Sequence, residues 1–114
     1  MSDCIFCKIA AGEIPGDVVY SDDEVLAFRD LNPQAPTHVL VIPRRHIATL
    51  NDLEPADAEL AGRMLLAAKA VAAAEGLAER GYRTVFNCNA EAGQSVFHVH
   101  LHVLGGRRLT WPPG

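Results

Sequence analysis

The sequence contains no long apolar run and no basic cluster. No apolar stretch of the 114 residues is long enough to cross a bilayer, and the opening Met-Ser-Asp-Cys lacks the basic and apolar regions of a secretory signal. The formal net charge is −4, and the arginines form short pairs where a nucleic-acid surface would need a basic face. We therefore expect a cytoplasmic protein with a single domain over residues 1–114, and no membrane or nucleic-acid partner.

Two phosphate-binding devices are also missing. The chain has no GxxxxGK[ST] loop to hold a triphosphate and no carboxylate cluster to hold Mg²⁺. Cysteine is scarce too, with three residues, two of which form the CxxC pair Cys4 and Cys7. A structural zinc needs four ligands, so the others would have to be histidines, such as His46 and one of those near residue 100. A zinc site and two plain buried thiols both fit this pattern.

The most informative stretch is residues 98–104, where histidines at 98, 100 and 102 alternate with aliphatic residues. This period of two predicts a strand with one buried face. The three imidazoles would then share the other face, about 6 to 7 Å apart, close enough for one small anion to touch two of them. A strand face made only of histidines indicates a functional site, since surface strands usually carry mixed polar residues.

The rest of the chain predicts an α+β fold. Apolar and β-branched runs predict further strands at residues 17–20, 24–28, 38–42 and 82–87, and an alanine- and leucine-rich run predicts one long helix over residues 54–75. Leu60, Met64, Ala68 and Val71 form a helical stripe that we expect to pack against the sheet. The small residues Ala61, Ala67 and Ala72 would permit a second helix to approach.

Imidazoles suit phosphorus chemistry. A neutral histidine is a nucleophile and a proton carrier near neutral pH, so it can hold a transferred group covalently. Asn87, Gln94, Ser95 and the backbone around Gly93 could hold non-bridging oxygens. The pattern therefore indicates phosphoryl or nucleotidyl transfer without a metal, although His-x-His on a strand is also a zinc chelate. Asp30 alone indicates only a loop carboxylate or a turn cap.

Residues 98–104 match His-φ-His-φ-His-φ-φ, where φ is apolar, and this pattern resembles the signature of the histidine triad (HIT) superfamily. The segments 33–38, 40–43, 93–96 and 111–114 are more narrowly similar to the Hint branch, the purine nucleoside phosphoramidases. The resemblance implies a five-stranded antiparallel sheet with one long helix and a short N-terminal helix. It also implies a homodimer with a continuous ten-stranded sheet.

The resemblance implies an enzyme that cleaves the P–N bond of purine nucleoside 5′-phosphoramidates and binds purine nucleoside monophosphates. His100 would be the nucleophile that forms a nucleotidyl-histidine intermediate, and His102 would bind phosphate oxygens. Ser95 would assist departure of the amine, and His38 would orient His100 and share a proton with it.

The resemblance also implies a binding role for other residues. Asp30 would accept hydrogen bonds from the ribose hydroxyls, and Trp111 would reach toward the partner's site. The base would be bordered by Phe6, Ile9, Phe28 and Leu31, and the phosphate pocket would be completed by Asn87, Gly93, Gln94 and Ser95.

In bacterial relatives that keep the CxxC pair, the resemblance suggests a structural zinc held by Cys4, Cys7, His46 and His98, while catalysis itself needs no cofactor. Two alternatives stay open. One is a zinc-stabilised nucleotide-binding or protein-interaction module with little turnover, and the other is a dinucleoside polyphosphate hydrolase. The role of Arg29 is also open.

Overall fold

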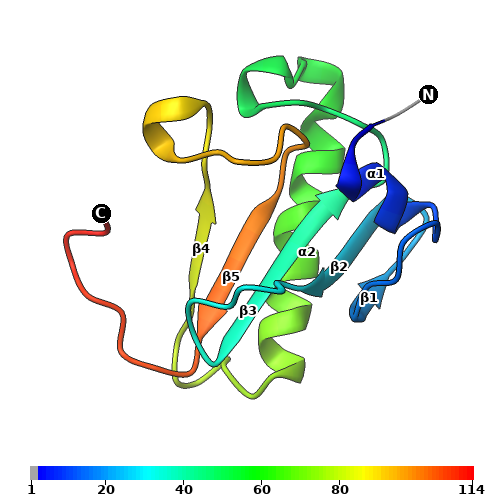
Figure 1. Cartoon of the computed structure of the whole chain (residues 1–114). Helices are drawn as coiled ribbons and strands as arrows, with labels where there is room; N and C mark the ends of the chain where they lie inside the picture. Colours follow the sequence, from blue (N-terminus) through cyan, green and yellow to red (C-terminus); the bar gives the residue numbers. More distant parts are fainter. Residues whose placement is uncertain (1–2) are drawn as a thin grey trace.

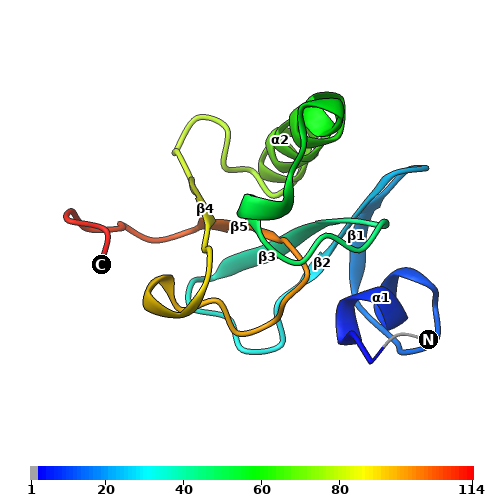
Figure 2. The same cartoon turned by 90° about the horizontal axis from the view of Figure 1, so that it is seen from above.

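A computed structural model describes residues 3–114 and shows an antiparallel sheet with a helix on each face (Figures 1 and 2). The strand order is β1-β2-β3-β5-β4. The strands are β1 Val18–Ser21, β2 Val25–Arg29, β3 Thr37–Pro43, β4 Arg83–Phe86 and β5 Leu101–Gly105. The helices are α1 Ile5–Ala10 and α2 Ala58–Ala74, and short 3₁₀ turns lie at Leu50–Asp52, Pro55–Asp57 and Ala90–Ala92. This arrangement confirms the predicted α+β fold, with five strands and one long helix.

The long helix α2 covers one face of the sheet, as Figure 2 shows from above. Its predicted stripe is buried, and it packs on inward-facing residues of β2, β3 and β5 such as Ala27, Val39 and Val103. This cluster is the larger of two apolar cores. At the end of β5, a Cβ on Gly105 would lie 2.6 Å from Leu77 Cδ1, so only glycine permits this close packing after the helix.

The short helix α1 lies against the opposite face, beside β1 and β2 (Figure 2). A second, smaller core forms there, in which Phe6 of α1 packs with Leu26, Phe28, Leu40 and Ile42. The two cores draw on alternate residues of the same strands. The period of two in the sequence therefore decides which side chains support the long helix and which face α1.

Two helix predictions need correction. The predicted start at Glu54-Pro55 is a separate 3₁₀ turn, and regular α-helix begins only at Ala58. Ala67 and Ala72 were predicted to face a second helix, but both are buried in this chain's larger core. Their small size serves the contact of α2 with its own sheet.

The histidine strand also starts later than predicted. β5 begins at Leu101, opposite Val41 of β3, so His98 and His100 precede the strand. The ladder ends here because Pro43 has no N–H to donate. The N–H of Val99 instead donates to Ile47 O in the loop that follows β3. Even so, Val99, Leu101 and Val103 are all buried in the larger core.

The edge of the sheet beside β5 is formed by β4, which stands last in the strand order. The C-terminal tail runs out past this edge in Figure 1. None of the helices within residues 3–114 has the length and apolar character needed to span a bilayer.

Candidate functional site

A cavity of about 230 Å³ opens between α1, β2 and the start of β5. It contains many of the residues predicted from the sequence: its walls include Phe6, Ile9, Phe28, Asp30, Leu31, Ser95, His100 and His102. One side is apolar and the other carries imidazoles, a hydroxyl and a carboxylate. Such a cavity suits a ligand with a flat apolar part and an anionic part.

Several other residues in the cavity wall were missed by the sequence analysis. Ile5 lies one helical turn before Ile9 on α1, a spacing that could have revealed it. The turn residues Pro15, Gly16 and Asp17 gave no such signal. Their place in the wall follows from how the loop after α1 folds back on the sheet.

The predicted nucleophile, His100, has a fixed hydrogen position. Its Nδ1 lies 2.8 Å from the carbonyl oxygen of His98. A carbonyl oxygen only accepts, so Nδ1 carries the hydrogen and Nε2 of the neutral ring keeps its lone pair. The ring is 6% exposed and packs edge-on against Phe6, with 5.1 Å between ring centroids. In its neutral form, this nearly buried ring in the cavity wall therefore keeps the lone pair of Nε2.

A second fixed arrangement joins His38 and His102. The backbone N–H of Gln34 donates to Nδ1 of His38 at 3.0 Å, so the hydrogen of the neutral His38 ring is on Nε2. That Nε2 lies 2.8 Å from Nδ1 of His102 and 3.4 Å from an oxygen of Asp30. His102 therefore accepts at Nδ1 and carries its own hydrogen on Nε2. The sequence analysis expected His38 to act on His100, whereas the structure places it against His102.

Both rings of this pair are held neutral. Burial, with smaller contributions from His100 and His38, lowers the pKa of His102 to about 4. Burial also lowers the pKa of His38, although the Asp30 carboxylate acts in the opposite direction. At neutral pH the pair therefore provides one N–H donor, on His102, without adding positive charge to the site.

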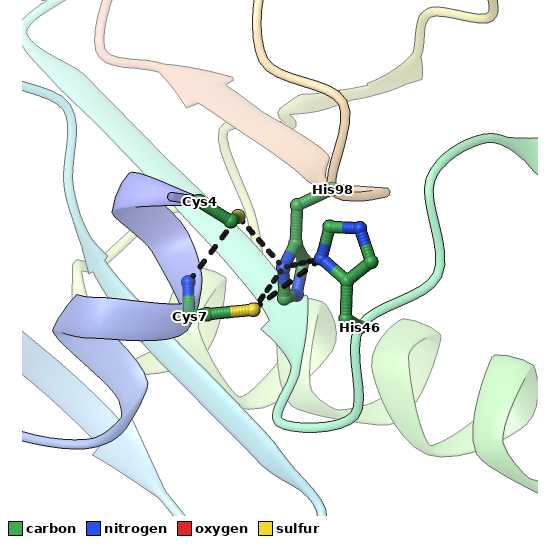
Figure 3. Close-up of side chains that lie close together, drawn as sticks. All are labelled: Cys4, Cys7, His46 and His98. Atoms are coloured by element: carbon green, nitrogen blue, oxygen red, sulfur yellow. Dashed lines mark hydrogen bonds between the residues drawn. The ribbon is translucent and has the colours of Figure 1, made fainter. Parts of the chain in front are cut away.

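His98 lies in another environment. It is fully buried, and its Nε2 donates to the carbonyl oxygen of Pro43 at 2.8 Å. Its Nδ1 therefore keeps a lone pair, which faces Cys4, Cys7 and His46 (Figure 3). Burial lowers the pKa of His98, and a neutral imidazole is the form that binds metals.

The four residues of this cluster have the spacing of a tetrahedral metal site. Nδ1 of His98 lies 3.4 Å from the sulfur of Cys4, 3.5 Å from that of Cys7 and 3.3 Å from Nδ1 of His46. Around a tetrahedral Zn²⁺, bond lengths of about 2.3 Å to sulfur and about 2.05 Å to nitrogen separate S and N by about 3.6 Å and two nitrogens by about 3.3 Å. The donor set and its spacing therefore fit a metal ion.

Asp30, His38 and His102 also lie close enough to form a metal cluster. Their hydrogen bonds argue against that use. Because Gln34 N–H occupies Nδ1 of His38, the nitrogen that faces the cluster is the protonated Nε2. In contrast to His98, His38 presents a hydrogen where a metal would need a lone pair.

Four other predicted residues do not line the cavity. The side chain of Gln94 is buried, where it accepts from Asn89 N–H at 2.8 Å and donates to Ala48 O and Val96 O at 2.8 and 3.1 Å. Asn87 is half-buried in the same connection, and Gly93 adopts a left-handed conformation at φ +86°. Trp111 is 80% exposed on the tail, with the guanidinium of Arg83 5.9 Å from its ring.

Arg29, whose role the sequence left open, connects the cavity wall to α2. Its guanidinium donates to both oxygens of Glu75 at 3.0 and 2.9 Å and lies 3.4 Å from Asp17. These contacts lower the pKa of the Glu75 carboxyl, chiefly through the hydrogen bond from Arg29. Arg29 therefore joins the end of the long helix to the end of β2, directly before Asp30.

Comparison with known proteins agrees with this geometry. The model of the HIT domain family matches residues 11–109. The chain is 56% identical to a HIT-like protein of Synechococcus elongatus, over 98% of this chain and 97% of that protein. It is 51% identical to the purine nucleoside phosphoramidase of Escherichia coli K12, over 94% of this chain and 90% of the enzyme.

Solved structures give the same answer. A HIT family hydrolase from Legionella pneumophila superposes with a TM-score of 0.97 at 61% identity, and the match covers 98% of this chain and all of that one. A histidine triad protein from Clostridium difficile superposes with a TM-score of 0.93 at 44% identity, over 96% of each chain. The resemblance seen in residues 98–104 is confirmed, and the chain belongs to the HIT family.

Proposed function

We propose that this protein hydrolyses the P–N bond of purine nucleoside 5′-phosphoramidates, with His100 as the nucleophile. The observation that carries the proposal is the hydrogen bond from Nδ1 of His100 to His98 O, which places the lone pair of the neutral ring on Nε2 in a residue of the cavity wall. The 51% identity to an enzyme named purine nucleoside phosphoramidase supports the substrate class, and membership of the HIT family supports a hydrolase.

In the first step, Nε2 of His100 attacks the α-phosphorus and the bond from phosphorus to the substrate nitrogen breaks. The leaving amine needs one proton, which reaches it from solvent through the hydroxyl of Ser95 at the exposed side of the cavity. Nε2–H of His102 donates to a non-bridging oxygen as charge develops there. His98 O stabilises the nucleotidyl-imidazolium by accepting from its Nδ1–H.

In the second step, water attacks the phosphorus and the bond from phosphorus to Nε2 breaks. His100 departs as the neutral ring with its hydrogen still on Nδ1, and the water releases one proton to solvent. The products are the nucleoside monophosphate and the amine, and the protons taken up and released balance. No step of this proposal uses a metal.

The cavity walls provide the binding contacts of this proposal. Phe6, Ile9, Phe28 and Leu31 border the base, and Asp30 accepts from the ribose hydroxyls. Ser95 in the wall, together with Asn87, Gly93 and Gln94 from the connection outside the wall, is proposed for the phosphate. The structure favours Ser95 within this set, because the side chain of Gln94 is occupied by Asn89, Ala48 and Val96 and its backbone N–H donates to Asn89 O at 3.1 Å.

We assign the metal of Cys4, Cys7, His46 and His98 to zinc. Two thiolates and two imidazoles are a common ligand set for structural zinc, and the two thiolate charges balance those of the ion. A preparation made without chelators should hold about one zinc per chain. A chain that holds far less, and that binds none when zinc is added, would contradict the assignment.

The quaternary proposal is a homodimer. Because β4 stands last in the sheet, pairing with β4 of a second copy would create the ten-stranded sheet. The tail carrying Trp111 runs out past the same edge, in position to reach a partner (Figure 1). Sedimentation velocity should give the mass of two chains. The cytoplasmic location stays a prediction.

Hydrolysis of adenosine 5′-phosphoramidate by wild type and His100→Ala tests the activity. Removal of a covalent nucleophile should lower kcat by several orders of magnitude, while AMP binding persists. Hydrolysis that survives unchanged in His100→Ala would falsify the proposed mechanism.

The metal cluster favours a second candidate, a zinc-stabilised nucleotide-binding or protein-interaction module with little turnover. Tight AMP binding without hydrolysis by the wild type would support it. Preference for diadenosine polyphosphates over phosphoramidates would instead identify a dinucleoside polyphosphate hydrolase.

A further inference from the structure

One residue, His98, belongs to both the metal cluster and the active site. Its side chain places Nδ1 among Cys4, Cys7 and His46, while its backbone carbonyl accepts the Nδ1–H of His100 at 2.8 Å. Side chain and carbonyl belong to the same fully buried residue. A shift of the His98 backbone would therefore change both the metal cluster and the group that sets the hydrogen position of His100.

Phe6 provides a second connection. It lies between the two cysteines on α1, and its ring contacts His100 and His98 with centroid separations of 5.1 and 6.0 Å. It also packs edge-on against Phe28 at 5.3 Å, in the wall of the cavity. A metal that fixes Cys4 and Cys7 would thereby fix the ring against which His100 rests.

The helix α1 has little else to hold it in place. Six residues are far fewer than the roughly 12 to 15 that an isolated helix needs in water. Besides the smaller core, α1 is joined to the rest of the chain by the contacts of Cys4 and Cys7 with His46 and His98, and at its end by a hydrogen bond from Arg44 to Ala10 O at 3.0 Å. The larger core contains no residue of α1, so the sheet and α2 should stay folded when α1 loosens.

We propose that the metal cluster positions the nucleophile, with His98 and Phe6 as the positioning residues. A divalent ion held by Cys4, Cys7, His46 and His98 keeps α1 docked and the His98 carbonyl aimed at His100. Without the ion, Phe6 and the carbonyl lose their fixed places, and the active site is less ordered although the fold persists. The inference rests on the proposed function for its substrate.

The test compares zinc-loaded chain with chain stripped by a chelator under reducing conditions. In the absence of ligand, the hydrogen-bonded Nδ1–H of His100 should give a resolved imidazole resonance in the loaded protein that broadens or disappears in the metal-free protein. AMP affinity should fall by about tenfold or more on metal loss and return when zinc is added. Far-UV circular dichroism should show that the sheet and α2 persist.

Cys88→Ser provides the matched control, because Cys88 is a thiol outside the cluster. It should keep both the resonance and the AMP affinity, whereas Cys7→Ser should lose both. Metal-free wild type with an unchanged resonance and unchanged AMP affinity would overturn the inference. Loaded wild type that fails to bind AMP would instead contradict the proposed function, so the two failures are distinguishable.

Phe6→Leu tests the positioning role of Phe6 with the metal in place. It therefore tests the proposal even if the metal-free chain unfolds. It should bind zinc in the wild-type amount, yet weaken the His100 resonance and lower kcat more than it raises KM. A residue that merely borders the base would raise KM and leave the ligand-free resonance intact. That second result would overturn the role of Phe6.

Discussion

His38 and His102 are joined nitrogen to nitrogen, with Nε2 of His38 2.8 Å from Nδ1 of His102. Because Gln34 N–H fixes the hydrogen of His38, the direction of this bond is set by the backbone. The neutral ring of His102 is thereby held in the form that carries its hydrogen on Nε2.

His38→Ala should lower kcat by about 10- to 100-fold, by analogy with the loss of a partner that orients a metal-bound imidazole. Steady-state hydrolysis of adenosine 5′-phosphoramidate gives the measurement. His38→Gln is the matched variant, because its amide can still donate to His102, and it should recover part of the loss. An unchanged kcat in His38→Ala would show that His102 needs no orienting partner.

The lowered pKa of His102 predicts how stability changes with pH. The pKa is about 4 in the folded chain and near 6.5 when unfolded, so the unfolded state binds more protons between these values. The free energy of unfolding should therefore fall as the pH drops from about 6.5 to about 4, with His102 contributing on the order of 1–3 kcal/mol.

Urea denaturation across this pH range measures the effect. His102→Asn should flatten the slope relative to wild type. His38 and His98, whose pKa values are also lowered, would retain their share of the slope. Equal slopes in the two proteins would refute the assignment to His102.

Gln94→Glu should destabilise the fold. A carboxylate cannot donate to Ala48 O or Val96 O, and both carbonyls would then face a buried negative charge. We expect a loss of about 2–3 kcal/mol in the free energy of unfolding, measured by urea denaturation. Glu91→Gln is the control, an exposed change in the same connection, and it should have little effect. Equal stability of both variants would mean that the amide contributes nothing.

The Arg29–Glu75 pair should contribute modestly to stability. Its geometry is bidentate, but the Arg29 side chain is 41% exposed, so we expect a coupling of about 0.5–1 kcal/mol. A double-mutant cycle with Arg29→Gln and Glu75→Gln measures it. The exposed pair Arg63 and Glu59, 3.5 Å apart on α2, is the comparison and should couple close to zero. If the coupling energy is no larger than that of Arg63 and Glu59, the ion pair of Arg29 with Glu75 does not stabilise the fold.

The periodic parts of the fold could be predicted because apolar patterns report burial directly. The stripe from Leu60 to Val71 and the aliphatic side of residues 98–104 are buried as expected. The start of β5 could not be predicted, because it depends on Pro43 of β3, which pairs with β5 but lies far from it in the sequence. The packing partner of Ala67 and Ala72 could not be predicted either, because small residues occur on a helix both where it packs on a sheet and where it packs on a second helix.

In the candidate site, too, local residue patterns could be interpreted, whereas contacts between distant segments could not be predicted. Residue types predicted that His100 and His102 would lie in the candidate site, as the cavity lining shows, but hydrogen positions depend on neighbours distant in sequence. His38 was paired with the wrong histidine because strand register, with His38 opposite Leu104 and Leu40 opposite His102, decides which rings meet. The amide of Gln94 looked like a phosphate ligand, and only the folded chain shows that Asn89, Ala48 and Val96 occupy it.

The separation of the two apolar cores by a single sheet has a consequence for engineering. Residues such as Phe28 and Leu40 shape the ligand cavity, whereas Met64 and Val39 secure the long helix on the other side. Libraries that vary only the cavity side leave the larger core untouched, so many members should still fold. The residues of the cavity wall should therefore accept substitution at little risk to the packing of the long helix.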